Sequence, residues 1–176
     1  MNYRYSFLIV VILFSISCTS QSNKSEKEAS NNSNSVYWVN DYADVLSTEE
    51  ESQLTQVLKS LEDSIGSQMV ILTIPSIGDQ TIEEYSLQTA RKWKIGRANY
   101  DDGILITMAV NDRKVRIEVG YGLELIIRDE IAAMIIRDQM IPAFRDGLYF
   151  KGLSEGSREI IKRIYSNPEL VGVKND

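Results

Sequence analysis

Histidine is absent from this chain of 176 residues, and cysteine occurs once, at position 18. Without histidine the protein lacks the commonest zinc ligand and the commonest general base, so a histidine-based catalytic triad is excluded. A single cysteine cannot form a disulfide within the chain, nor a metal site that needs several thiolates. The chemistry of this protein must therefore rest on other side chains, and carboxylates are the most numerous candidates.

Long apolar runs are scarce too, and the longest, Phe7–Phe14, lies near the N-terminus after Arg4. Eight residues are too few to span a bilayer as a helix, but they suit the apolar part of a secretory signal. Ser15-Ile16-Ser17-Cys18 resembles a bacterial lipoprotein cleavage box, in which Cys18 becomes the lipidated N-terminus. The alternative is an ordinary cleavage site between small residues. We expect residues 1–17 to be a signal peptide, and the mature protein to be exported and lipid-anchored to the cell envelope, facing the periplasm or the surface.

Composition divides the rest of the chain into three parts. Residues 18–35 are rich in Ser, Asn, Lys and Glu and have almost no apolar side chain, so we expect a disordered tether after the lipidated cysteine. A folded domain is predicted from 36 to 166, followed by a short tail from 167 to 176. The net charge of −6 argues against nucleic acid as a partner and favours cations or basic protein surfaces.

Capping residues and apolar spacing predict alternating helices and strands within the domain. Ser47 with Glu50, and Thr81 with Glu84, form two capping boxes, each followed by apolar residues at helical spacing. The predicted elements are a turn at Asn40-Asp41, a helix from Ser47 to Gly66, a strand at Met69–Ile74, a helix from Thr81 to about Trp93, a hairpin at 103–119, a helix from Asp129 that Pro142 ends, and a last helix containing Leu153 and Ile164. This order predicts an α/β sandwich in which a small mixed sheet, with a central β-hairpin, is flanked by helices.

The predicted hairpin gathers acidic residues at one edge of the sheet. Ile104–Ala109 is an apolar run typical of a strand buried on both faces, and the alternation over 115–119 is typical of a half-buried strand. In an antiparallel pair the start of the first strand adjoins the end of the second. Asp101 and Asp102 should therefore lie beside the Gly120–Glu124 segment.

Carboxylates held close together repel one another unless a cation neutralises them, and Ca²⁺ accepts six to eight oxygen ligands in loose geometry. A metal site is therefore one interpretation, and replacing Asp102 by Asn should then relieve repulsion in the metal-free protein. The other interpretation is a set of unconnected turn and capping residues. The candidate metal ligands are Asp101, Asp102, Glu124 and Asp129, with Asp41 as a further member.

Arg116 and Arg128 are the candidate phosphate ligands. An arginine beside a metal–carboxylate cluster can hold phosphate through two parallel hydrogen bonds. The alternative is that each arginine pairs with a neighbouring acid, and Arg116 shares its strand face with Glu118.

These segments together resemble the TPM domain family, whose members include a thylakoid-lumen acid phosphatase and many bacterial envelope proteins. The resemblance covers about residues 36–165 in family order, and its most specific run is Arg116–Glu124. The other matching blocks are 39–43 with Leu46, 93–96, 101–105, Asp112-Arg113, Asp129, 142–145 and Gly152-Leu153. The resemblance implies a three-layer α/β/α sandwich with Rossmann-like layering and a divalent-metal site, often for Ca²⁺, with Mg²⁺ possible, built from acidic loop residues.

Two classes of function are open on this resemblance. The first is a calcium-binding envelope module that acts through contacts with an envelope protein partner, for example in membrane-protein maintenance. The alternative is a metal-dependent acid phosphatase, a phosphomonoesterase in which the cation polarises phosphate and activates water while an arginine binds the other oxygens.

Overall fold

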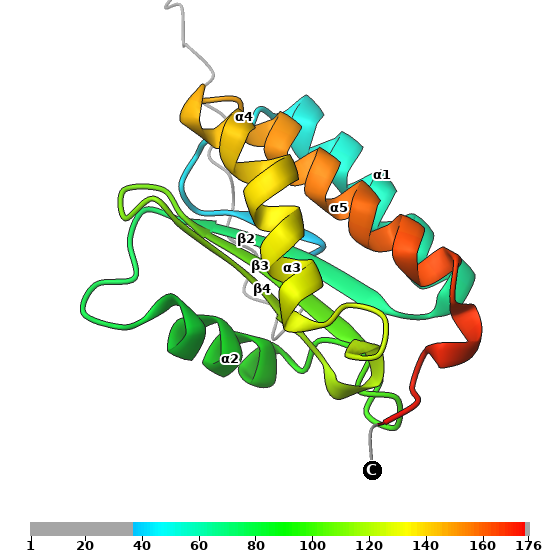
Figure 1. Ribbon diagram of the computed structural model, residues 1–176. Coiled ribbons are helices and arrows are strands. Elements are labelled where there is room, and N and C mark those ends of the chain that lie inside the picture. Colours follow the sequence, from blue (N-terminus) through cyan, green and yellow to red (C-terminus); the bar gives the residue numbers. More distant parts are fainter. Residues whose placement is uncertain (1–36, 175–176) are drawn as a thin grey trace, which may run out of the picture. The chain divides into compact units, whose positions relative to one another are not determined.

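Four strands form one mixed sheet in the order β1-β2-β3-β4 (Figure 1). The computed structural model describes residues 37–174; the predicted signal peptide, Cys18 and the tether lie outside them. β1, β2 and β3 run parallel, and β4 returns antiparallel to β3 as the predicted hairpin. The strands are β1 (Val39–Asp41), β2 (Gln68–Ile74), β3 (Gly103–Ala109) and β4 (Lys114–Val119).

Helices cover both faces of this sheet, so the predicted three-layer α/β/α sandwich is confirmed. α2 lies on one face, and α1, α3 and α5 lie on the other (Figure 1). The helical elements are α1 (Thr48–Ile65), α2 (Ile82–Trp93), the 3-10 turn η1 (Tyr121–Leu123), α3 (Asp129–Ile135), the π-helical η2 (Ile136–Met140), α4 (Ile141–Arg145), α5 (Tyr149–Tyr165) and the 3-10 turn η3 (Pro168–Leu170). Within residues 37–174 no helix is long and apolar enough to cross a membrane.

The two predicted capping boxes start α1 and α2. At α1 the Ser47 hydroxyl accepts a hydrogen bond from the Glu50 N–H, and the Glu50 carboxylate accepts one from the Ser47 N–H. Thr81 and Glu84 repeat the arrangement at α2. Gly66 ends α1 in the left-handed conformation, with φ of 88°, which a residue without a side chain adopts at little cost.

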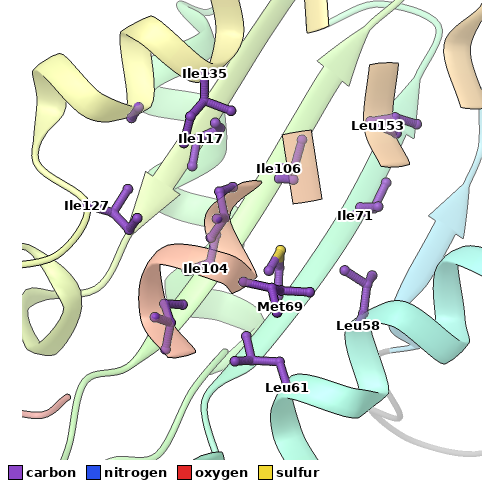
Figure 2. Close-up of a cluster of buried hydrophobic side chains, with 14 of the residues drawn as sticks. Leu58, Leu61, Met69, Ile71, Ile104, Ile106, Ile117, Ile127, Ile135 and Leu153 are labelled. Atoms are coloured by element: carbon purple, nitrogen blue, oxygen red, sulfur yellow. The ribbon is translucent and has the colours of Figure 1, made fainter. Parts of the chain in front are cut away.

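Burial on both faces makes β2 and β3 the centre of the domain. Alternate residues of these strands point into two separate cores. The larger core, under α1, α3 and α5, includes Met69, Ile71, Ile104 and Ile106, as Figure 2 shows. The smaller core, under α2, is built on Val70, Leu72, Ile74 and Leu105.

The smaller core also contains polar groups without partners. The hydroxyls of Ser86 on α2 and Thr107 on β3 are buried and make no hydrogen bond within the described residues. A buried hydroxyl that lacks a partner costs about 1–3 kcal/mol.

The two parallel crossovers have opposite hands. The connections through α1 and through α2 both step in the same direction across the sheet, yet the two helices lie on opposite faces. One of them therefore departs from the right-handed rule for β-α-β units. Because the strand order does not reverse, the sheet has the layering of a Rossmann fold without the crevice at a reversal point that usually holds a ligand.

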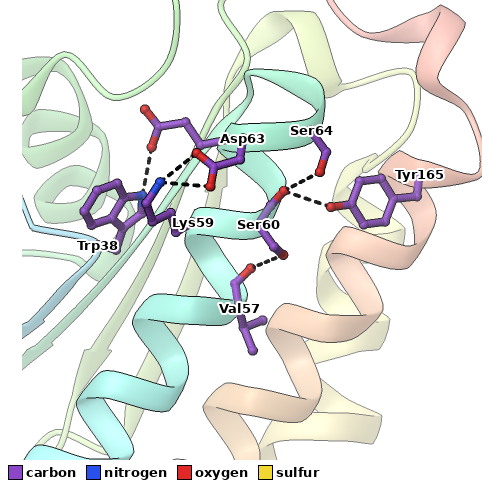
Figure 3. A network of polar contacts seen from close by, with 8 residues as sticks. Trp38, Val57, Lys59, Ser60, Asp63, Ser64 and Tyr165 are labelled. Carbon is purple, nitrogen blue, oxygen red and sulfur yellow. Dashed lines mark hydrogen bonds and ion pairs between the residues drawn. The ribbon is translucent and has the colours of Figure 1, made fainter.

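Polar contacts join the outer side of α1 to Trp38, which directly precedes β1, and to α5, as Figure 3 shows. The Trp38 indole N–H donates to the Glu62 carboxylate at 2.8 Å, and the Lys59 ammonium lies 5.7 Å from the centre of the same ring. At the far end of α5 the Tyr165 hydroxyl donates to the Ser60 carbonyl at 3.0 Å. These contacts place the first strand and the last helix on either side of α1.

Two predicted local features are wrong. Asn40-Asp41 belongs to β1 rather than to a turn, because the strand's partner is β2, which follows much later in the chain. Pro142 does not end the helix that starts near Asp129, since the chain continues as η2 and α4. The wider π-helical turn before Pro142 removes the α-helical bond that proline cannot make.

We predict that Ser47→Ala lowers the free energy of unfolding by about 1 kcal/mol at neutral pH, because α1 loses its cap. The Ser47 N–H, and then its hydroxyl, lower the pKa of Glu50. The stabilisation from a lowered carboxyl pKa is present above the unfolded-state value and is lost as pH falls, so the difference between wild type and variant should shrink in acid. Urea unfolding at two pH values measures both effects.

The matched control is Ser64→Ala, which removes an exposed serine hydroxyl that donates to the Ser60 carbonyl in the body of the same helix. This variant should change stability little at either pH. An equal loss of unfolding free energy in the two variants would show that the Ser47 cap stabilises α1 no more than an ordinary exposed serine does.

Candidate functional site

The open end of the hairpin is held together by backbone contacts, as the sequence predicts. The Gly120 N–H donates to the Gly103 carbonyl at 2.8 Å, and the Gly122 N–H donates to the Asp101 carbonyl at 3.0 Å. A Cβ on Gly122 would lie 1.8 Å from the Tyr100 carbonyl oxygen, and one on Gly120 would lie 2.1 Å from the Asp101 carbonyl oxygen. The two segments can pack this closely only because these positions carry no side chain.

A cleft of about 540 Å³ opens beside this end of the hairpin, between the C-terminal part of α2 and the β4–η1 connection. We call it the α2 cleft. Its charged lining contains three acidic and three basic residues: Asp101, Glu118, Glu124, Arg91, Lys94 and Arg97. The predicted site at this edge is therefore one of mixed charge rather than a purely acidic one.

Asp102 is fully buried and its carboxylate serves the structure. It accepts hydrogen bonds from the Arg97 backbone N–H at 2.8 Å, from the Arg97 guanidinium at 2.8 and 2.5 Å, and from the Ser67 hydroxyl at 3.1 Å. Arg97 also stacks on Tyr100, with its guanidinium carbon 3.9 Å from the ring centre. Both oxygens of Asp102 thus have donors within the chain, and its charge is balanced by Arg97.

Basic residues also pair with two further acids near the cleft. The Asp101 carboxylate pairs with the Lys174 ammonium at 2.5 Å, and Glu118 pairs with the Arg116 guanidinium at 3.2 Å. Lys174 reaches Asp101 because the predicted tail lies against the domain, where the Gly172 N–H donates to the Gly122 carbonyl at 2.8 Å. Arg116 therefore takes the second of the two roles that the sequence left open, an ion pair with its neighbour.

Asp41 lies at the opposite end of the sheet. It is level with Thr73 of β2 and Met108 of β3, six residues along the strand from Asp102, which corresponds to roughly 20 Å. Its carboxylate accepts the N–H groups of Val45 and Leu46 at 2.9 and 2.8 Å and the Thr73 hydroxyl. Asp41 fixes the loop between β1 and α1, so its grouping with Asp101 is corrected.

The remaining predicted residues lie around the start of α3. Glu124 is half-buried and lines the α2 cleft with Asp101. Asp129 is exposed and is the first helical residue, while the N-cap position belongs to the exposed Arg128, which makes no capping bond. Within residues 37–174 no group of three or more acidic side chains is close enough to hold a metal ion together.

Among the charged residues of this site, those not found from the sequence are Arg91, Lys94, Arg97, Glu118 and Lys174. Arg97 and Lys174 supply the charges that the repulsion argument left out. Their partners are 5 and 73 residues away, and no spacing rule for side-chain pairs covers either separation. Glu118 could have been included, because the predicted alternation of β4 places it on the face opposite Ile117.

The family model described as TPM domain matches residues 39–163. The chain belongs to the TPM domain family. The solution structure of the N-terminal domain of a P. gingivalis protein is 36% identical, covers 78% of this chain and 87% of its own, and has a TM-score of 0.71. No curated protein matches this chain.

Two more distant solution structures resemble this TPM domain in fold alone. The BA42 protein of Bizionia argentinensis is 17% identical, with a TM-score of 0.61, and the match covers 69% of this chain and 82% of that one. The N-terminal domain of the cg2496 protein of Corynebacterium glutamicum is 10% identical, with a TM-score of 0.59, over 84% and 89% of the two chains.

The TPM domain also contains a G-x-S-x-G match at Gly152–Gly156, the pattern of a nucleophile elbow. That elbow is a sharp turn between a strand and a helix, whereas this match lies inside α5. A Cβ on Gly152 would lie 2.4 Å from the Phe144 ring, and one on Gly156 would lie 2.8 Å from Met140. The glycines serve close packing of α5 on η2 and α4.

We predict that Asp102→Asn destabilises the metal-free protein by roughly 2–3 kcal/mol, because Arg97 loses its buried charged partner. This reverses the expectation that neutralising Asp102 relieves repulsion. Asp101→Asn, which removes an exposed ion pair, should cost less than about 1 kcal/mol. Denaturant unfolding in the presence of a chelator compares the two variants, and a stabilised Asp102→Asn would contradict the assignment.

Proposed function

We propose that this TPM domain is a divalent-cation binding module of the cell envelope, with Ca²⁺ as the preferred ion, and that it acts through contacts with an envelope protein partner. The observation that carries the proposal is the pairing of Asp101 with Lys174 in a cleft that Glu124 also lines. Asp101 already holds a positive charge at a partly exposed position, where a solvated ion has access.

The residues present fit a divalent cation in part. The site is reduced from the predicted five carboxylates to two, Asp101 and Glu124. Asp102 and Asp41 are engaged elsewhere in the fold, and Asp129 does not line the α2 cleft. Two carboxylates with carbonyl oxygens and water satisfy a hard cation such as Ca²⁺, which tolerates irregular geometry. Mg²⁺ should bind more weakly, since it demands regular octahedral ligands and gives up its water reluctantly.

Lys174 is the expected competitor of the cation. Its ammonium occupies the Asp101 carboxylate at 2.5 Å, so binding of an ion to that carboxylate requires Lys174 to move away. The pair is about half exposed, and exposed pairs of this kind contribute 1 kcal/mol or less, so the competition is weak. The phosphatase alternative has less support, because its candidate phosphate ligand Arg116 is paired with Glu118.

Calcium should raise the melting temperature of the wild-type domain by several degrees at millimolar concentration. An ion that binds only the folded state stabilises it by about 2.7 kcal/mol when the free ion is a hundredfold above Kd. Each kcal/mol raises the melting temperature by ~2–8 °C. Asp101→Asn should abolish the calcium-dependent rise, and Lys174→Met should enlarge it by removing the competitor. Differential scanning calorimetry with and without chelator gives these shifts.

Lys151→Met is the matched control, because Lys151 pairs with Glu155 at 4.0 Å on the exposed side of α5. It should leave the calcium response as in wild type. Absence of any calcium shift in wild type, or an undiminished shift in Asp101→Asn, would sink the metal proposal.

The place of the module in the envelope is a separate proposal that rests on Cys18. We expect Cys18→Ala to abolish labelling of the protein by a fatty-acid precursor and to release the domain from the membrane fraction. Each methylene buried in the membrane contributes about 0.8 kcal/mol to the binding free energy. A single acyl chain therefore binds only reversibly, and stable anchoring needs more than one. Cys18→Ser serves as a second variant, and persistent labelling in both would show that Cys18 is not the lipidated residue.

A further inference from the structure

A second and larger cleft lies at the turn end of the hairpin, away from Asp101. Its volume is about 740 Å³, within the range of clefts that hold small ligands. It lies beside the end of β3 and the start of β4, and residues of η2, α4 and the start of α5 close it. We call it the turn cleft.

Apolar residues are the most numerous in the lining of the turn cleft, and their arrangement depends on the π-helical turn. Ile136 and Ile141 both line it, although they are five residues apart. In an α-helix such residues would point ~140° apart, whereas the i to i+5 bonding of η2 brings them onto the same side. The same wall carries Phe144, and Met108 and Val115 of the hairpin face it.

All charged residues in the lining of the turn cleft are basic, which reverses the sign of the chain's net charge of −6. They are Arg113, Lys114 and Arg145, all exposed, and none forms an ion pair within residues 37–174. Asp112 in the same turn does not line the cleft. Its carboxylate accepts from the Ile77 N–H at 2.8 Å and the Ser76 hydroxyl at 3.0 Å, and Lys114 is close enough to contribute to the lowering of its pKa.

Arg113 occupies a backbone position that suits glycine better. Its φ of 53° lies in the left-handed region, which costs a residue with a side chain roughly 1–2 kcal/mol. An arginine at this position places a guanidinium at the mouth of the turn cleft at the expense of local stability. Strained positions of this kind are typical of ligand-binding segments.

We propose that the turn cleft binds a small anionic amphiphile, a single alkyl chain or aromatic body that ends in a carboxylate. The apolar wall of Ile136, Ile141 and Phe144 covers the tail, and the exposed cations of Arg113, Lys114 and Arg145 pair with the head. The absence of acidic residues from this lining gives an anion nothing to repel it. This site shares no residue with the α2 cleft, so the proposal is independent of the calcium proposal.

Decanoate, below the concentration at which it forms micelles, is a suitable probe for amide chemical shifts in two-dimensional NMR. We expect saturable shifts at Val110–Lys114 and at Ile141–Gly147. Acetate lacks the tail and decyltrimethylammonium has the opposite head charge, so both should bind at least about tenfold more weakly. Equal binding of decanoate and decyltrimethylammonium, or no saturable shift with decanoate, would overturn the proposal.

Arg113→Gly gives the sharpest variant, because glycine suits the backbone there and the fold should be preserved or stabilised. We expect Arg113→Gly to lower decanoate affinity about tenfold without lowering the melting temperature. Arg145→Gln should lower decanoate affinity by a similar factor. Arg137→Gln is the control, since this exposed arginine of η2 pairs with Asp138 and does not line the cleft. Unchanged affinity in both Arg113→Gly and Arg145→Gln would contradict the assigned head-group site.

Discussion

The buried carboxylate of Asp102 holds the segment on which the open end of the hairpin depends. Three donors of Arg97 and the Ser67 hydroxyl enclose it, so the chain between α2 and β3 has a fixed course. That course brings Tyr100 and Asp101 against Gly120 and Gly122, where only glycine fits. The α2 cleft, the exposure of Asp101 and the docking of the C-terminal residues all follow from this one charged contact.

The hairpin gives the domain two clefts of different character at its two ends. At the open end three acidic and three basic side chains line the α2 cleft. At the turn end the lining combines apolar residues with cations and contains no acidic residue. A protein with a net charge of −6 thus keeps a local positive surface, and no residue lines both clefts.

Short-range features were predictable from the sequence because their causes lie within a few residues. The capping boxes at Ser47 and Thr81 and the hairpin at 103–119 have local signals, and the structure contains all three. The strand order, the membership of Asn40 in β1 and the partner of Asp102 depend on pairings between distant segments. The sequence predicts repulsion among the carboxylates, because no local pattern indicates that Arg97 and Lys174 lie beside Asp102 and Asp101.

The unequal cores on the two faces of the sheet mean that the domain need not open as a single unit. Local opening favours elements that bury little apolar surface. α2 packs on the smaller core, covers the unpartnered hydroxyls of Ser86 and Thr107, and belongs to one of two crossovers of opposite hand. Detachment of α2 would widen the cleft that its C-terminal residues line. A ligand bound in that cleft would therefore also stabilise the packing of α2 on the sheet.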